Sequence, residues 1–374
     1  MKKILINTLL VLLALLFLSL SASAYDIDNI ESFESDIKDQ LHSIVDDSVM
    51  DTLEDIGIGD FDFSEVYNIS FGNITKFFSV TLKDKIKSSL NIFFELMCIV
   101  MLTGTVATLF GNNSDSGFIG LLGTVIIILL SVSRISDTLS AVVSVLQLSG
   151  KFMLSFVPIY TLIISLSGNP ASALTYNTFV ISFAELMSAF ITSGFTDLLG
   201  VFFCLGISFS MNSSINIGRF ISAVNRAVST LLGLSASVFS GFLSIKNILS
   251  ASVDSVSVKG IRYLIGSLIP VVGSSISEAY SSLLGSINLI KSSVAVIGVL
   301  VIVIINTPII FETLTFYISF SLLSFIADSV NATRTGDVLR TLSCGVKILL
   351  LVCVFEMFIL IISTGILLSV RNGR

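Results

Sequence analysis

The chain of 374 residues is 53% hydrophobic and only 12% charged, with 26 acidic and 20 basic side chains and a mean hydropathy of +0.98. A soluble domain would carry about twice that charged fraction, so the composition indicates an all-α, polytopic integral membrane helix bundle with a short exported acidic N-terminal region. A single histidine, His42, and four scattered cysteines exclude a multi-histidine metal site and a disulfide framework.

The first 24 residues have the three parts of a secretory signal peptide. Two lysines follow Met1, an apolar run extends from Ile4 to Leu20, and small residues occupy positions 21–24. Cleavage after Ala24 would leave a mature chain that begins at Tyr25, outside the cytoplasm. Because the apolar run is close to the upper length of a signal, an uncleaved first transmembrane helix is the alternative.

Residues 25–88 are expected to form an exported acidic amphipathic region followed by a basic membrane-surface helix. Fourteen acidic residues lie between Asp26 and Glu65, against the single basic residue Lys38. Apolar residues at helical spacing predict one amphipathic helix there. A segment of about fifty residues can bury only a small hydrophobic core by itself, so the apolar stripe of this helix should pack on another part of the chain. The alternative is a solvated leader that only keeps the exported end soluble. Four lysines between Lys76 and Lys87 predict the surface helix.

Apolar segments after residue 89 predict seven membrane spans, plus or minus two, grouped as a first transmembrane bundle (89–245) and C-terminal transmembrane helices (292–374). Several segments are shorter than the ~20 residues that cross a bilayer squarely, so pairs of them are candidates for hairpins or half-helices. A weaker candidate is Leu231–Ile245. The eight main segments are Leu90–Phe110, Ile119–Ser133, Phe152–Leu166, Thr178–Ile191, Leu198–Met211, Val294–Phe311, Leu314–Ala327 and Ile348–Leu368.

The distribution of basic residues gives conflicting orientations. The positive-inside tendency places one cluster, from Arg219 to Arg262, and a second, from Arg334 to Lys347, in the cytoplasm. Cleavage of the signal would then leave the lysines at 83–87 outside. Arg371 also cannot share the side of the second cluster if one span separates them. One of these assignments must fail.

Residues 246–291 are expected to form a polar broken-helix hairpin. Apolar residues follow helical spacing on both sides of Pro270, which interrupts the helix because it lacks a backbone donor. A polar stripe follows, with Ser274, Glu278, Ser281 and Ser282. This stripe requires water or polar partners. It fits either an interfacial or extramembrane hairpin, or a broken helix that lines a cavity or pore.

Two carboxylates, Glu185 and Glu356, lie well inside apolar segments. An intramembrane carboxylate is costly unless it faces a partner or water, so both are candidate pathway residues. Carboxylates near segment ends, such as Glu95 and Glu312, are expected to reach the membrane interface. No catalytic residue, cofactor site or metal site is predicted, and the chain lacks a glycine-rich phosphate loop that ends in Lys-Ser or Lys-Thr.

The run VKGIRYLIGSLIPVVGSSISEAYSSLLGSINLIKSSVAVIG, from Val258 to Gly298, closely resembles the stage III sporulation protein AE family of endospore-forming Firmicutes. The resemblance lies in a basic residue and an aromatic before Pro-Val-Val-Gly, an acidic residue followed by alanine, and a Lys-Ser pair before a long apolar span. In the order of its segments, the resemblance extends over the mature chain. The resemblance implies a mother-cell membrane subunit of the secretion-like channel, or feeding tube, that joins mother cell and forespore.

The same resemblance implies other stage III sporulation membrane proteins as partners, with the lipid bilayer as surroundings, no nucleic acid, and homo-oligomerisation left open. The family has no established catalytic residues, so no site is carried over. Two other mechanisms fit the residues. One is a stand-alone secondary transporter or exporter with broken helices, and the other is a non-conducting membrane scaffold.

Overall fold

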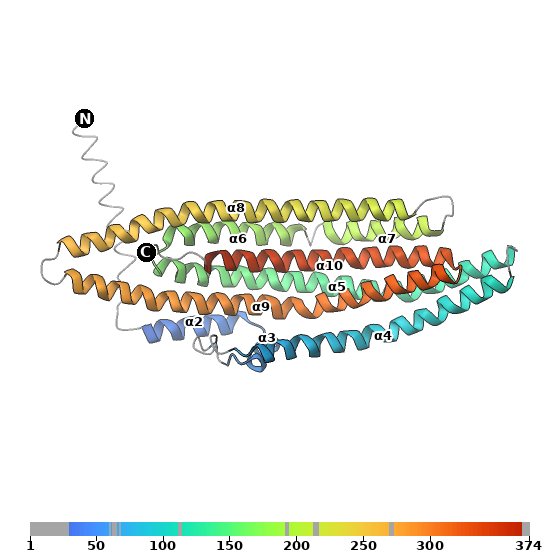
Figure 1. Ribbon diagram of the computed structural model, residues 1–374, viewed down its shortest axis with the longest axis horizontal. Coiled ribbons are helices and arrows are strands. Elements are labelled where there is room, and N and C mark those ends of the chain that lie inside the picture. The colour runs from blue at the N-terminus through green and yellow to red at the C-terminus, as the bar shows by residue number, and fades with distance from the viewer. Residues whose placement is uncertain are drawn as a thin grey trace, which may run out of the picture.

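A computed structural model describes residues 30–59, 61, 66, 69–110, 114–190, 194–211, 217–268 and 273–368. The expected signal peptide and Arg371 lie outside these ranges. The described residues form α-helices joined by short connections, with no β-strand among them (Figure 1). The helices are α2 (Ile30–Ile44), α3 (Asp47–Ile56), α4 (Phe71–Phe110), α5 (Ser114–Leu166), α6 (Pro170–Phe190), α7 (Thr196–Met211), α8 (Ile217–Leu268), α9 (Gly273–Ser329) and α10 (Thr333–Leu368).

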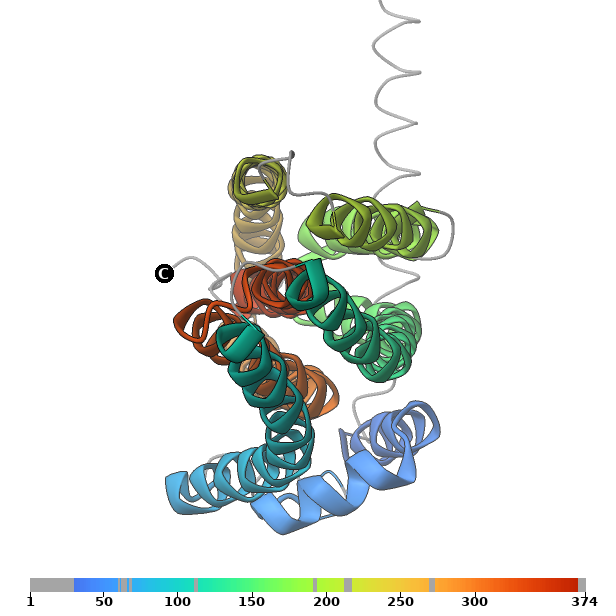
Figure 2. The same cartoon turned by 90° about the vertical axis from the view of Figure 1, so that its right-hand side faces the viewer.

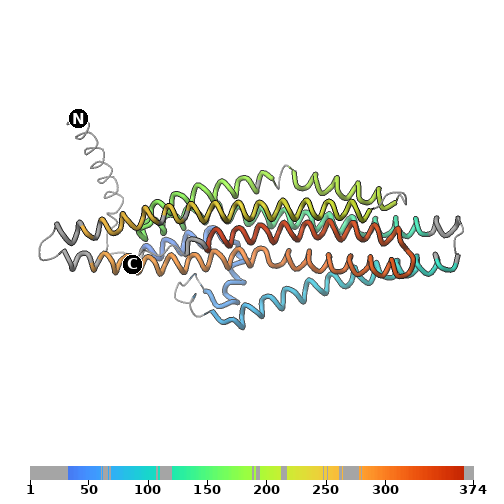
Figure 3. The backbone as a smooth tube through the Cα atoms, turned by 45° about the horizontal axis from the view of Figure 1, so that its top comes forward, coloured from blue at the N-terminus to red at the C-terminus, as the bar shows by residue number. Residues whose placement is uncertain are grey.

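From α4 onward the helices run up and down one elongated bundle (Figures 1 and 3). Three or four residues separate α4 from α5, α5 from α6, α8 from α9 and α9 from α10, and connections this short favour antiparallel neighbours. Helices α6 and α7 follow one another in the same direction, so the two together run along the bundle once. At 1.5 Å per residue the 57 residues of α9 extend about 85 Å, well over twice the ~30 Å hydrocarbon core of a bilayer.

Among the described residues, five helices are long and apolar enough to cross a membrane, which confirms the membrane-bundle class. Five is the lower limit of the expected seven spans, plus or minus two. The two segments expected between Ile119 and Leu166 are parts of α5, and the two between Val294 and Ala327 are parts of α9. The polar residues between such segments lie within the continuous helices, where their hydroxyls bond to carbonyl oxygens of the same helix. Thr313 Oγ1, for example, donates to the carbonyl oxygen of Ile309 at 2.8 Å.

The domain boundaries expected at 88/89, 245/246 and 291/292 fall inside α4, α8 and α9. The basic residues before 88 therefore belong to the first half of α4. The polar hairpin consists of the end of α8 and the beginning of α9. The first basic cluster is also divided. Arg219 and Lys259 lie 40 residues apart on α8, or about 60 Å, so they occupy opposite ends of the bundle.

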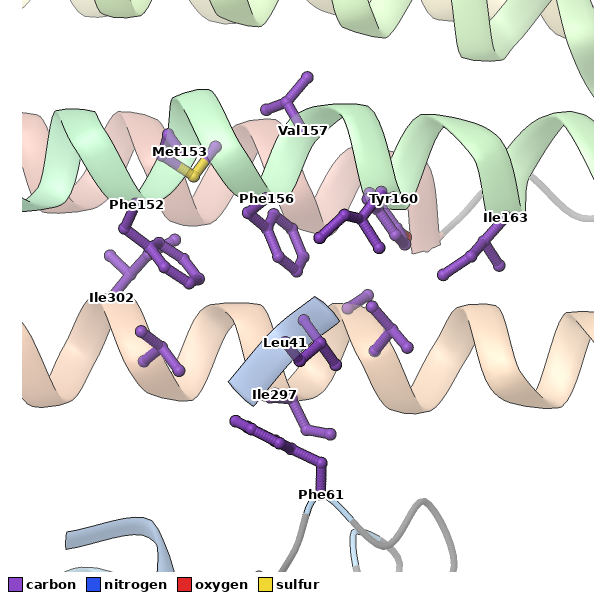
Figure 4. Packing of buried hydrophobic residues seen from close by; sticks show 14 of the residues in the cluster. Leu41, Phe61, Phe152, Met153, Phe156, Val157, Tyr160, Ile163, Ile297 and Ile302 are labelled. Carbon is purple, nitrogen blue, oxygen red and sulfur yellow. The ribbon is translucent and has the colours of Figure 1, made fainter. Parts of the chain in front are cut away.

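The acidic N-terminal region packs on the bundle, as its apolar spacing predicted, but it forms two helices in place of one. Leu41 and Leu53 are fully buried, in one cluster with residues of α5 and α9. Figure 4 shows Leu41 and Phe61 around Ile297 of α9. Seen end-on, α2 and α3 cover one side of the bundle while α8 lies on the opposite side (Figure 2).

Candidate functional site

The hairpin between α8 and α9 projects beyond the neighbouring helices at one end of the bundle (Figure 1). Val258 of α8 and Leu284 of α9 flank Gly168, in the turn between α5 and α6. About ten residues of each arm continue past this level, which corresponds to about 15 Å of helix. The predicted polar stripe lies on this projecting part.

The stripe faces out of the bundle. Glu278 and Ser282 are exposed and Ser281 is half-buried, whereas Leu284, Ile287 and Ile290 on the other face are buried. The two-faced pattern is thus confirmed where the structure describes it, and the stripe does not line a passage within this single chain. Ser274 lies in the first turn of α9, and Pro270 lies outside the described residues.

A buried aspartate that the sequence analysis did not single out holds this end of the bundle together. Asp254 is the only carboxylate of α8 and is 1% exposed. Its Oδ1 accepts a hydrogen bond from the Ala171 N–H at 2.8 Å, and its Oδ2 accepts one from the Ser172 N–H at 2.9 Å. These donors belong to the first turn of α6, where backbone N–H groups lack helical partners and the helix dipole favours an anion.

The turn before α6 fits closely between α8 and α9. Gly168 has φ +86°, a conformation that is unfavourable for residues with a side chain, and a Cβ there would lie 3.1 Å from Val258 Cγ2. One helical turn further along, Thr175 and Ser250 share a hydrogen bond of 2.7 Å between their hydroxyl oxygens. The α5–α6 turn therefore fixes the level from which the hairpin projects.

A second polar contact joins α4 to α9 midway along the bundle. Lys85 Nζ lies 2.6 Å from Glu312 Oε2, and the Ser89 hydroxyl donates to Thr315 Oγ1 at 2.7 Å. Lys85 thus lies within the continuous helix α4, and Glu312 pairs with a lysine of the same chain.

Glu356 occupies the bundle interior. It is 4% exposed, and its Oε2 has no hydrogen-bond partner among the described residues. It borders a pocket with a volume of about 10 Å³. The other residues that line this pocket are Leu146 and Gly150 of α5, Phe183, Ala184 and Met187 of α6, and Leu360 of α10. Glu185 also lies on α6, but its side chain is exposed. The structure therefore does not bring the two predicted carboxylates together.

Other buried polar groups tie the long helices to one another. Asn306 of α9 donates from Nδ2 to the Ser149 hydroxyl of α5 at 2.9 Å, and Thr124 shares a 3.1 Å hydrogen bond with Thr335. Hydrogen bonds of this kind stabilise helix pairs within membranes. No group of three or more His, Cys, Asp or Glu side chains is placed to hold a metal in the described part of the chain.

These features define the class of the protein as an elongated, polytopic membrane helix bundle with a projecting polar hairpin and, among the described residues, two buried carboxylates, Asp254 and Glu356. The family model for stage III sporulation protein AE (spore_III_AE) matches residues 56–370. The chain therefore belongs to the stage III sporulation protein AE family.

A curated relative supports the same assignment. The chain is 19% identical over 287 residues to the stage III sporulation protein AE of Bacillus subtilis (strain 168), a stretch that covers 76% of this chain and 71% of that protein. No solved structure matches the chain significantly.

Proposed function

We propose that this chain is a multi-pass membrane subunit of the mother cell to forespore channel complex that forespore development requires during sporulation. The observation that carries the proposal is the family match, which spans the whole bundle from α4 to the last described residue of α10. The protein acts in the mother-cell membrane around the forespore, with its N-terminal region outside the cytoplasm. It works through partners and not through a catalytic site.

The projecting α8–α9 hairpin supports a role in subunit contact. Its exposed side chains include Lys259, Tyr263, Glu278 and Ser282. Exposed charges of both signs are unfavourable against lipid tails, so this surface suits water or another protein. We assign the hairpin as the contact with other stage III sporulation membrane proteins.

Site-specific photo-crosslinking in sporulating cells tests this role. A benzoylphenylalanine at Tyr263 replaces an aromatic that is 74% exposed on the hairpin, and the matched control replaces Phe325, an aromatic that is 70% exposed on α9 near the opposite end of the bundle. We expect adducts with other stage III sporulation membrane proteins from position 263 and none from 325. The absence of protein adducts at 263, in cells that complete sporulation normally, would contradict the proposal.

A stand-alone secondary transporter is the second candidate, and the buried Glu356 favours it because membrane transporters use interior carboxylates for ion coupling. The two functions differ in what the purified chain does alone. Solute flux into liposomes under a proton or sodium gradient, abolished by Glu356→Gln, would identify a transporter. A subunit gives no flux without its partners. A non-conducting scaffold would give no flux even when the complete complex is reconstituted.

A further inference from the structure

Glu356 and its pocket have no part in the proposed contacts of the hairpin. We propose that Glu356 is an exchangeable proton-binding site inside the bundle, which takes up and releases one proton through the pocket between α5, α6 and α10. Uptake forms an O–H bond at a Glu356 carboxylate oxygen, and release returns the proton to water. The inference goes beyond the subunit role and does not depend on it.

The surroundings of Glu356 favour the protonated acid over the carboxylate. Apolar residues make up the rest of the pocket lining, apart from Gly150, and none of the lining residues of α5, α6 or α10 carries a cation that could pair with a negative charge. The charged residues next to the lining on those helices are Lys151 and Glu185, and both are exposed. The other titratable neighbour is Cys353, a buried thiol one turn away on α10. An unpaired carboxylate in such surroundings is strongly disfavoured, whereas the neutral acid is tolerated.

The size and chemistry of the pocket favour a proton over a metal cation. A space of about 10 Å³ is close to the minimum for one water molecule. Hard cations need several oxygen ligands. Besides Glu356, the side chains that line the pocket contribute no oxygen atom. A single carboxyl group can bind a proton but cannot by itself supply the several oxygen ligands that a metal cation needs.

Gly150 is part of the pocket lining. A Cβ at this position would meet nothing within 4 Å, so a side chain can be introduced there without displacing a neighbour at its first carbon. The adjacent Ala184 is also small and buried. A valine at 150 would add three carbon atoms to the lining of a pocket of about 10 Å³ and so reduce the space beside the acid. Gly150→Val therefore separates the role of the pocket from that of the carboxyl group itself.

Dicyclohexylcarbodiimide, an apolar reagent that adds to protonated carboxyl groups, tests the site on the full chain in lipid nanodiscs. Peptide mass analysis locates and quantifies the adduct. We expect modification at Glu356, with a rate that falls by roughly tenfold for each pH unit above the midpoint of its transition. Glu185→Gln, which alters an exposed carboxylate on α6, should leave the rate unchanged, and Gly150→Val should lower it.

Three results would overturn the inference. Absence of Glu356 modification at every pH would show that no protonated, reachable acid exists. A rate independent of pH would show a permanently bound, structural proton. Protection by sodium at constant pH would assign the site to a metal cation. Because the assay uses the purified chain, none of these results bears on whether the protein is a subunit of the sporulation complex.

Discussion

Asp254 on α8 accepts a hydrogen bond from the backbone N–H of Ala171 on α6 across 2.8 Å, although 83 residues separate them in the chain. Asp254→Ala should lower the free energy of unfolding by about 1–3 kcal/mol, because the buried N–H of Ser172 and the partly buried N–H of Ala171 lose their acceptor. Since the chain has no tryptophan, unfolding is best followed with a thiol-reactive dye that detects exposure of the buried Cys344 and Cys353.

The matched control for this measurement is Ser252→Ala, on the exposed face of the same helix. Its hydroxyl bonds only to the carbonyl oxygen of Ile248 within α8, so its removal should leave the midpoint of unfolding unchanged. The exposed Cys98 and Cys204 are replaced by serine in all variants so that they give no background signal. Equal midpoints for the Asp254 and Ser252 variants would rule out a stabilising role for the Asp254 contact.

Gly168→Ala should destabilise the bundle by roughly 1–2 kcal/mol, because its φ of +86° is unfavourable for alanine. Its Cβ would also lie close to Val258. The double variant Gly168→Ala with Val258→Ala should not restore stability, since it removes the close contact but not the backbone cost. The control Gly285→Ala, where a Cβ meets nothing within 4 Å, should be neutral or slightly stabilising. The same dye measures all three variants.

Ser89 and Thr315, whose hydroxyl oxygens lie 2.7 Å apart, should form a disulfide when both are replaced by cysteine in a chain without its four native cysteines. Mild oxidation followed by mass analysis detects the bond. Ser88→Cys paired with Thr315→Cys is the control, because the Ser88 side chain is exposed on another face of α4. If the basic part of α4 lay on the membrane surface, apart from α9, neither pair would crosslink.

The mature protein should begin near Tyr25, since small residues end the apolar leader at Ala24. Peptide mass mapping of the chain purified from membranes checks this. An Ala22→Arg/Ala24→Arg variant should retain the leader, because large charged residues block the cleavage site. Persistence of peptides from residues 1–24 in the unaltered membrane form would mean that this segment is an uncleaved transmembrane helix.

Composition and apolar spacing determined the class of this protein. A chain with few charges and long apolar stretches can satisfy its backbone in a membrane only as helices or closed barrels, and its periodicity favours helices. The spacing also predicted which face of residues 280–290 is buried and that the acidic N-terminal region packs on the bundle. In both segments one face is polar, so the sequence itself distinguishes inside from outside.

Only the tertiary structure decided which polar residues lie in the interior. Glu185 and Glu356 both lie inside apolar segments, and the sequence does not distinguish them. A helix that is apolar on all sides does not show which of its faces contacts a neighbouring helix. Asp254 caps α6 through a contact over 83 residues, which no local pattern encodes. Serine and threonine residues lie within the continuous helices α5 and α9, where their hydroxyls bond back to the same helix, as Thr138 does to the Arg134 carbonyl oxygen. Propensity alone would not predict this, because these residues can equally end a helix.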